Sequence, residues 1–501
     1  MSFSLLSTLL PLLLGPVLFM MPNVGVTLPN QAPPDPVADA ARFETVAKQL
    51  DSGGVLYGYV SVDGDLTAIG AYVKSFMDEL RKIEPDVPPV DVSAILKVSG
   101  LDAISAVGFS SKSVEGGFRN KSYLYTPKGR RGLLRLLGGE SKPFDVVKLA
   151  PAGSDFVFEQ DLNLKVVYES VQEALVAGMG EQGALFKAMM DGAVKQPLPP
   201  PIPFTMEKVL ADLDTQITVI IDADPDKKIS FTHPDAKGLH PPLMRAAILI
   251  DELGWVADEL ANILEPMLAH PTERRPPAKI VRDPNWVGVQ LAIEPEQYAA
   301  MDADILELFG RTNPVLVHHR PSGKLILATG LEFAENLFIP KPNLADDPAF
   351  RKTMAGLPKK GTAMAYVSPA LFSGLREVFE KVIDAENDRG IGRAEHLVAT
   401  TSLNLFLPKN SRGEGSVTTN DKDGILTVSN SAHSHKANII SSAASPLLMA
   451  ITASFGALQP VLMMDDVEAV HDHEGHDHEQ FLELEQLLDP GLKQRAPERG
   501  D

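Results

Sequence analysis

Cysteine is absent from this chain of 501 residues. Its absence excludes disulfide bonds, thiol catalysis, cysteine-ligated zinc, iron–sulfur clusters and a lipidated N-terminal cysteine. A chain without cysteine can reside in either redox compartment, so the composition is compatible with export without requiring it.

Positive charge is scarce as well. The chain has 46 Lys and Arg residues against 66 Asp and Glu residues, which gives a net charge of −20 and a pI near 5.1. Nucleic acid is therefore not an expected partner, because its phosphates require a basic surface. The segment from Asp465 to Asp501 holds 12 acidic and 3 basic residues, so nearly half of the net charge lies in this tail.

Motifs that identify common enzymes are also missing. The chain has no Gly-x-Ser-x-Gly nucleophile elbow, no Gly-x-x-x-x-Gly-Lys phosphate loop and no Gly-x-Gly-x-x-Gly turn after a predicted strand. No His-x-x-x-His pair with an adjacent glutamate is present, so nothing indicates a catalytic zinc site. The sequence therefore predicts no catalytic and no cofactor-binding residues.

The N-terminus carries a long apolar run. Phe3 to Met21 is almost wholly apolar, and a polar, proline-rich stretch follows through Pro36. This order is typical of a secretory signal peptide, which we assign with its proline-rich exit to residues 1–40. A retained membrane anchor and a buried helix are the alternatives, because no Lys or Arg precedes the run.

One phrase occurs twice in the chain. Gly54-Val55-Leu56-Tyr57-Gly58-Tyr59-Val60-Ser61 returns as Gly361-Thr362-Ala363-Met364-Ala365-Tyr366-Val367-Ser368. Each phrase is typical of an apolar strand, and each is followed by apolar residues at helical spacing and then by strand-like segments. We expect a duplicated strand–helix–hairpin unit, with chance similarity between two strands as the alternative.

Three folded units are predicted between the termini. A first α+β repeat unit covers residues 42–195, a middle α+β unit covers 204–342, and a second copy of the repeat unit covers 346–431. Strands followed by helices and then by hairpins predict an α+β fold with mainly antiparallel sheets and helices packed on one face.

Local patterns assign elements within these units. Leu243 to Leu268 carries an apolar stripe and is predicted to form one long helix. Thr400–Leu407 and Ile425–Ser429 are predicted to form a hairpin, as Ala103–Ser110 and Phe118–Thr126 do in the first unit.

The start of each repeat resembles a known pattern. Leu357-Pro358-Lys359-Lys360-Gly361 and, more loosely, Leu50-Asp51-Ser52-Gly53-Gly54 precede the two strand phrases. Such units resemble those of uncharacterised bacterial exported proteins that are grouped as a domain of unknown function. The resemblance covers roughly residues 45–460 and implies a cell-envelope location. It implies no established activity and carries over no catalytic residues.

A second apolar segment lies near the C-terminus. Asn438 to Met464 contains no charged residue and is long enough to span a bilayer. Serine, threonine and glutamine dilute it, and Pro446 and Pro460 interrupt it. We predict an apolar helix over 438–464, which is buried or docked on the surface, or which spans a membrane.

The acidic tail over 465–501 contains the densest cluster of metal-ligating side chains. Four imidazoles alternate with carboxylates, and these are His471, His473, His476 and His478. Imidazole suits zinc, nickel and copper, and such tracts bind these metals loosely. The alternative is a solvated acidic tail with incidental metal affinity.

Six other histidines are predicted to be solvated loop residues, because a role requires geometry that the sequence does not supply; the alternative for each is a metal ligand or a general base. They lie in a proline-bounded loop, after a strand and near the C-terminal apolar segment: His233, His240, His318, His319, His433 and His435.

These observations favour a non-enzymatic exported protein that acts as a binding or structural scaffold. Its location is predicted to be periplasmic, cell-envelope or extracellular, and its partner is an unidentified protein or envelope component. Membrane association is expected only through the N-terminal segment or through 438–464. The alternatives are a hydrolase with a dispersed active site and a metal-handling protein that uses its histidine-rich tail.

Overall fold

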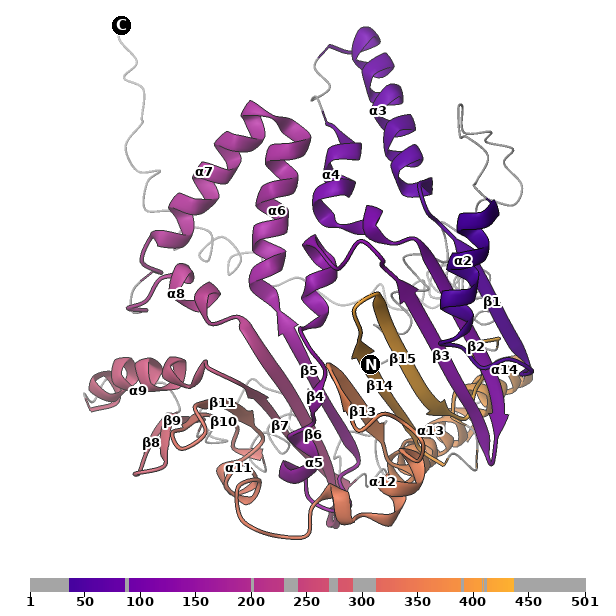
Figure 1. Ribbon diagram of the computed structural model, residues 1–501. Coiled ribbons are helices and arrows are strands. Elements are labelled where there is room, and N and C mark those ends of the chain that lie inside the picture. Colours follow the sequence, from indigo (N-terminus) through magenta and orange to yellow (C-terminus); the bar gives the residue numbers. More distant parts are fainter. Residues whose placement is uncertain are drawn as a thin grey trace, which may run out of the picture. The chain divides into compact units, whose positions relative to one another are not determined.

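A single long antiparallel sheet runs through the computed structural model (Figure 1). The structure describes residues 36–85, 90–199, 202–228, 242–269, 278–291, 312–388, 392–407, 409 and 412–436. The chain divides into two units, residues 1–439 and 440–501, and all of the described residues belong to the first. The predicted signal segment, the 438–464 segment and the acidic tail lie outside the described residues, apart from Pro36 to Ala40.

The sheet has the order β1-β2-β3-β15-β14-β13-β5-β6-β7-β11-β10-β9-β8, and all neighbours in it pair antiparallel. The predicted α+β class with a mainly antiparallel sheet is therefore confirmed. The strands of this sheet are β1 (Leu56–Ser61), β2 (Ala106–Val114), β3 (Gly117–Tyr125), β5 (Phe156–Asn163), β6 (Asp214–Lys228), β7 (Pro242–Ile250), β8 (Ala278–Arg282), β9 (Trp286–Leu291), β10 (Val315–His319), β11 (Lys324–Ala328), β13 (Ala363–Val367), β14 (Glu414–Asn420) and β15 (Gly424–Ser431). Two short strands, β4 (Lys142–Pro143) and β12 (Lys360–Gly361), pair separately.

Helices gather at both ends of the strands. In Figure 1, α3, α4, α6 and α7 stand together at the top of the view, and α5, α11 and α12 lie at the lower end of the sheet. The helices are α2 (Pro36–Ala47), α3 (Asp65–Ile83), α4 (Val92–Ser99), α5 (Val146–Leu149), α6 (Leu164–Met179), α7 (Glu181–Lys195), α8 (Met206–Ala211), α9 (Gly254–Ala269), α11 (Leu331–Asn336), α12 (Pro348–Thr353), α13 (Pro369–Asp388) and α14 (Arg393–Phe406), with 3-10 turns η1 (Leu101–Ala103), η2 (Gly132–Leu137) and η5 (Leu344–Asp346). No helix of the described residues is long and apolar enough to cross a membrane.

The prediction of one helix over Leu243–Leu268 is wrong in its first third. Residues 242–250 form β7, and α9 begins only at Gly254. The run from Ala246 to Ile250 is apolar on both faces of the strand, so hydrophobic spacing does not separate strand from helix there. Pairing with β6 on one side and β11 on the other decides for the strand.

The predicted strand over Thr400–Leu407 is also wrong, because residues 393–406 form α14. The partner of β15 is β14, which contains Gly415. A Cβ at Gly415 would lie 2.3 Å from the sulfur of Met354, so the glycine lets the segment after α12 lie directly on the strand. A glycine inside a strand commonly marks such a close approach and hides the strand from propensity rules.

Helices do not all pack on one face as the sequence predicted. Side chains alternate along β10 and β11, so Leu316 and Leu325 point to the face opposite Val317 and Ile326. The first pair contacts the cluster around α9, whereas the second pair belongs to the cluster that includes α11. A sheet that is apolar on both faces needs cover on both.

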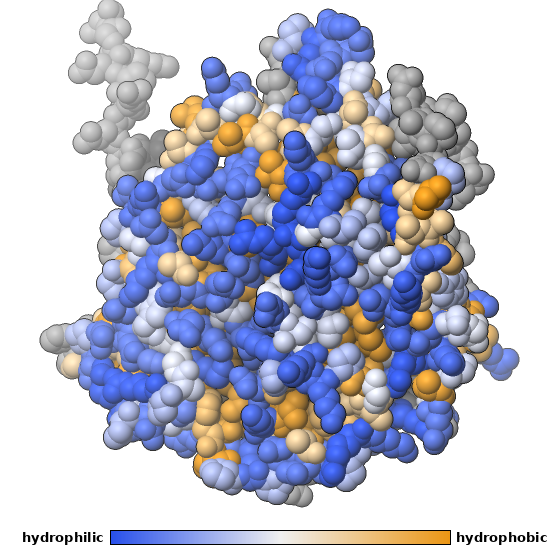
Figure 2. Space-filling model, viewed as in Figure 1, coloured by the Kyte–Doolittle hydropathy of each residue, from blue (hydrophilic) through white to orange (hydrophobic). Residues whose placement is uncertain are grey.

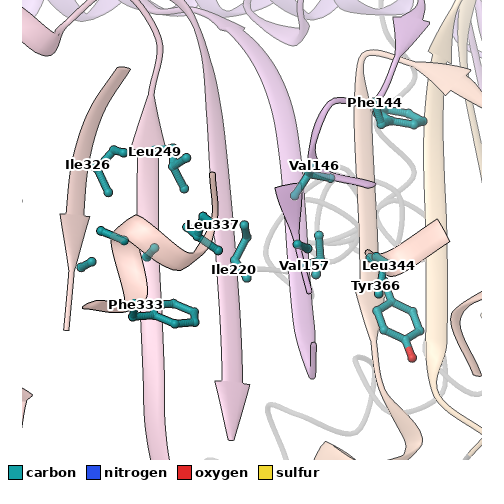
Figure 3. Close-up of a cluster of buried hydrophobic side chains, with 14 of the residues drawn as sticks. Phe144, Val146, Val157, Ile220, Leu249, Ile326, Phe333, Leu337, Leu344 and Tyr366 are labelled. Atoms are coloured by element: carbon teal, nitrogen blue, oxygen red, sulfur yellow. The ribbon is translucent and has the colours of Figure 1, made fainter. Parts of the chain in front are cut away.

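The largest core cluster lies on the face that carries α5, α11, α12 and η5. Figure 3 shows Val157, Ile220, Leu249 and Ile326 in a row across neighbouring strands, with Phe333 of α11 and Leu337, which follows this helix, against them. Each of these four strand residues is buried. Burial of one such side chain contributes about 1.5–3 kcal/mol, so this row anchors the middle of the sheet.

Two parts of the chain share one element order and one register. Both β1 and β13 are followed by two helices and a hairpin, and the strands stand in the mirrored order β1-β2-β3 and β15-β14-β13. Leu56 pairs with Ser111, and Ala363 pairs with Thr418; 363 and 418 are each 307 more than 56 and 111. The same difference relates the hairpin pair Gly108–Tyr123 to Gly415–Asn430.

The packing over these strands also corresponds. Phe43 of α2 meets Tyr59 edge to face at 5.2 Å, and Phe350 of α12 meets Tyr366 at 5.1 Å. Phe350 and Tyr366 again lie 307 positions after Phe43 and Tyr59, respectively. The strand β5 follows a related order, since α6, α7 and α8 stand between it and the strands β6 and β7.

Candidate functional site

A cavity of about 880 Å³ lies where β5 begins and where β6 and β7 approach their connecting segment. Helices α11 and α13 contribute further walls. Its lining combines apolar side chains with seven charged residues: Asp155, Asp222, Lys228, Arg245, Lys341, Glu377 and Lys381. The volume lies within the range of small-molecule sites, and we call this feature the charged cavity.

Arg245 makes ion pairs with two carboxylates of this cavity region. Asp222 and Arg245 are opposite one another in the β6–β7 register, so their side chains share a face. One Nη lies 2.6 Å from Asp222 Oδ2 and the other 3.5 Å from Asp224 Oδ2. The guanidinium carbon is 5.5 Å from the ring centre of Phe333. Burial raises the pKa of the Asp222 carboxyl, and Arg245 acts against that rise.

Lys341 places a second cation beside Arg245. Its Nζ donates to the main-chain oxygen of Asn336. Burial lowers the pKa of the Lys341 ammonium; Asp222 opposes this effect, and Arg245 adds to it. An ammonium has three donor hydrogens, so a carbonyl at one of them leaves donor capacity for an anion.

Asp155 lines the charged cavity, and Ser368 is its hydrogen-bond partner. Ser368 Oγ donates to Asp155 Oδ1 at 2.5 Å, and the N–H of Ala223 donates to Asp155 Oδ2 at 2.9 Å. Ser368 Oγ also accepts the N–H of Leu371 at 2.9 Å, which caps the start of α13. Both Asp155 and Ser368 are buried. This node therefore joins β13, β5 and β6 at one point.

The outer wall of the charged cavity is a helix face. On α13, Lys381 Nζ lies 2.8 Å from Glu377 Oε1. The hydrogen bond from Lys381 lowers the pKa of the Glu377 carboxyl. Lys381 and Glu377 are exposed at this wall.

The charged cavity carries side chains of both signs of charge. Four basic and three acidic groups line the cavity, on a chain whose net charge is −20. The buried hydroxyl of Ser368 donates to the Asp155 carboxylate and caps the start of α13, so it links this helix to the sheet.

A second buried carboxyl, Glu159, lies on β5 outside the cavity. Its two oxygens accept the N–H groups of Asp145 and Val146 at 3.2 and 2.6 Å, at the start of α5. Burial raises the pKa of Glu159 to about 7, against the opposing effect of these hydrogen bonds. Its contacts tie α5 to the sheet, which is a structural role.

The histidines at 318 and 319 differ from the expectation of solvated loop residues, because they lie within β10. His318 Nδ1 is 2.8 Å from Asp258 Oδ2 on α9. Its ring packs against the backbone at Gly254, where an added Cβ would lie 2.1 Å from the His318 Cδ2 and 2.5 Å from its Nε2. His319 is buried against Trp286 and Phe338, and burial lowers its pKa.

The histidines near the C-terminal apolar segment are also held by the sheet. The N–H of His435 donates to Ser111 Oγ at 2.9 Å, and its Nε2 is 3.1 Å from Ser122 Oγ. The carbonyl oxygen of His433 accepts from Asn120 at 2.9 Å. Burial lowers the pKa of His435 to about 4. His435 therefore docks the segment after β15 onto β2 and β3.

The predicted metal ligands, His471, His473, His476 and His478, lie outside the described residues, as do His233 and His240. Within the described ranges, no group of three or more His, Asp and Glu side chains is placed to hold a metal ion.

Sequence reasoning missed every member of the charged cavity. One local signal was available, because Asp222 and Asp224 alternate directly after the apolar strand residues 217–221. A second was Ser368, the last residue of the repeated phrase. Arg245 lay in a segment that was predicted to be helical, so its pairing with Asp222 could not be seen.

No family model, no curated protein and no solved structure matches this chain.

The Ser368 node generates a stability prediction. We expect Ser368→Ala to lower the free energy of unfolding by about 1–3 kcal/mol, because it removes a helix cap and leaves a buried carboxylate without one of its donors. Ser373→Ala is the matched control: Ser373 is exposed on the same helix and bonds only locally to Pro369, so its loss should change stability by less than about 0.5 kcal/mol. Urea unfolding measures both, and equal effects would contradict the assigned role of the node.

Glu159 generates a pH prediction. Its folded pKa of about 7 exceeds the ordinary value of 4.5, so its protonated form stabilises the native state. This contribution is complete below about pH 4.5 and is lost as the pH rises through about 7. It is on the order of 3 kcal/mol, since a tenfold shift in a protonation equilibrium is about 1.4 kcal/mol. Urea unfolding between pH 4.5 and 8 should show this loss in the wild type.

The variant Glu159→Gln should abolish that component, because an amide does not ionise. Glu181→Gln, an exposed position at the start of α7, should leave the wild-type pH dependence in place. A Glu159→Gln curve parallel to the wild-type curve would refute the assignment.

Proposed function

We propose that this chain is an exported, non-enzymatic binding protein of the cell envelope, in which duplicated sheet units form a scaffold and the charged cavity holds a small ligand with an acidic group. The observation that carries the ligand assignment is the pair of cations, Lys341 and Arg245, beside the apolar ring of Phe333. Concave sites with an apolar wall and a few convergent polar groups are typical of small-molecule binding.

Desolvation supports an anionic ligand. Burial already lowers the pKa of Lys341, and its ammonium donates to a neutral carbonyl oxygen. A bound carboxylate or phosphate would compensate the buried charge and add charge-assisted hydrogen bonds. Arg245 is held in place by Asp222, which orients its guanidinium for a planar acidic group.

The proposed duplication of the scaffold is supported by the shared register. Strand pairs, hairpin pairs and the Phe–Tyr contacts of the two parts correspond at the constant difference of 307 residues. Chance similarity between two strands would not extend to the contacts that each strand makes with a separate helix.

Export and an envelope location rest on the apolar N-terminal run and on the resemblance to exported proteins of a domain of unknown function. The missing cysteine is compatible with that location. We further propose that the histidine-rich tail binds zinc, nickel or copper loosely.

Ligand binding is tested by isothermal titration with short-chain and aromatic carboxylates and with inorganic and organic phosphates. We expect at least one of these anions to bind the wild-type protein, and Lys341→Met to weaken that binding about tenfold or more, because a charge-assisted contact is lost. Lys279→Met, an exposed change on β8, should bind as the wild type does.

If Lys341→Met and Lys279→Met bound the anion equally well, the charged cavity would not be its binding site. Turnover of hydrolase substrates by the purified protein, abolished by one point substitution, would overturn the non-enzymatic assignment in favour of a dispersed active site.

The tail is tested by titrating zinc or nickel into the full chain and into a variant in which His471, His473, His476 and His478 are all replaced by alanine. We expect the variant to lose most of the binding, because alanine removes the imidazole ligands and keeps the neighbouring carboxylates. A chain that ends at Met464 should behave like the variant. Binding that is equal in all three proteins would show that the tail is not the metal site.

A further inference from the structure

Strand β1 stands at one end of the sheet order, and among the described strands it pairs with β2 alone. The segment from Val55 to Ser61 contains no charged residue and no proline. The strand at the opposite end, β8, contains Lys279 and Arg282. Charged side chains on edge strands discourage further pairing, so β8 carries that protection and β1 does not.

Apolar side chains beside β1 are exposed, whereas the equivalent side chains beside β13 are buried. Residues of α2 and β1 can be compared with the residues that are 307 positions later. The exposed fractions are 76% for Val37 against 0% for Leu344, 43% for Phe43 against 8% for Phe350, 48% for Val55 against 3% for Thr362, and 37% for Tyr57 against 2% for Met364. Figure 2 shows open apolar surface at the right of the view, over α2. We call these four residues, Val37, Phe43, Val55 and Tyr57, the β1 patch.

The counterparts are buried because another strand and its preceding segment cover them. Strand β5 pairs with the outer edge of β13 along its whole length. The segment before β5 reaches the segment before β13, where the N–H of Leu344 donates to the carbonyl oxygen of Ala150 at 2.9 Å. The β1 patch is therefore apolar like the buried residues 307 positions later, but among the described strands none covers it as β5 covers β13.

The cover of β13 is itself a two-fold arrangement. Asn163 caps the helix after β5, and Ser368 caps the helix after β13. Glu159 lies four residues before the cap Asn163, and Met364 lies four residues before the cap Ser368. These two residues are opposite one another in the β5–β13 register. Strands β5 and β13 each precede a capped helix, and they pair antiparallel about a local two-fold axis. The counterpart of Met364 in β1 is Tyr57.

We propose that β1 is a dimerisation edge, which pairs antiparallel with β1 of a second copy of this chain and places Tyr57 opposite Tyr57 of the partner subunit. This arrangement repeats the β5–β13 junction between two copies and covers the β1 patch with its own equivalent. An antiparallel strand pair about a two-fold axis is closed, so assembly stops at the dimer through this edge. The inference rests on the shared register and is independent of the cavity's ligand.

The absence of cysteine makes cross-linking a clean test. Tyr57→Cys in the full chain should form a disulfide-linked dimer under mild oxidation, because opposite residues of an antiparallel pair have Cβ atoms about 4.5–5.5 Å apart. Val114→Cys is the matched control, since Val114 is 38% exposed against 37% for Tyr57 and lies at the tip of the β2–β3 hairpin. Cross-linking of Tyr57→Cys no faster than Val114→Cys would overturn the proposal.

Sedimentation of the uncross-linked protein provides the second test. We expect a wild-type dimer, and we expect Tyr57→Lys to weaken it about tenfold or more, because two like charges would face each other across the edge. Leu185→Lys, on the exposed face of α7, should leave the dimer intact, and circular dichroism of all three proteins verifies that they are folded. A dimer that persists in Tyr57→Lys would refute the β1 interface. A monomeric wild type would also overturn it.

Discussion

The hydrogen-bond ladder between β5 and β13 is the interaction on which the rest of the structure depends. It joins six strands on one side to seven on the other, and it brings together residues about 200 positions apart in the chain. Pairing of such distant segments costs loop-closure entropy, and burial of core residues such as Val157 and Ile220 must offset that cost. Asp155 and Ser368 hold one end of this ladder, and the carboxyl of Glu159 in its middle secures α5.

Polar groups buried at this ladder are tolerated because they have partners. The Asp155 carboxylate receives a hydroxyl and an amide, and Glu159 receives two amides. An unpaired carboxylate at such a depth would cost several kcal/mol, so each network also selects one register of the strands. The charged cavity forms where this polar end of the ladder meets the start of α13. Its ion pairs are a consequence of the sheet's register, since Asp222 and Arg245 are opposite residues of β6 and β7.

The candidate site was beyond prediction from sequence for a definite reason. Asp222, Lys341 and Ser368 lie on separate segments of the chain, and Arg245 directly precedes a run that is apolar on both faces, within the range for which the sequence predicts a helix. The histidines show the same limit of prediction from sequence. His318 and His435 looked like loop residues by spacing, whereas the sheet holds them against Asp258 and Ser122. The candidate site depends on which strands become neighbours, and local sequence patterns do not contain that information.

The sequence by itself determined the α+β class, the antiparallel sheet and the boundaries of strands such as Leu56–Ser61, because side-chain alternation and turn residues are local properties. It also contained the repeated phrase that led to the shared register. Only the tertiary structure decided that the predicted units contribute to one continuous sheet, that β13 lies inside it and that β1 lies at its end. The physical reason is that strand neighbours are chosen by the burial of whole faces. Two strands with similar sequences can therefore become a core element and an open edge.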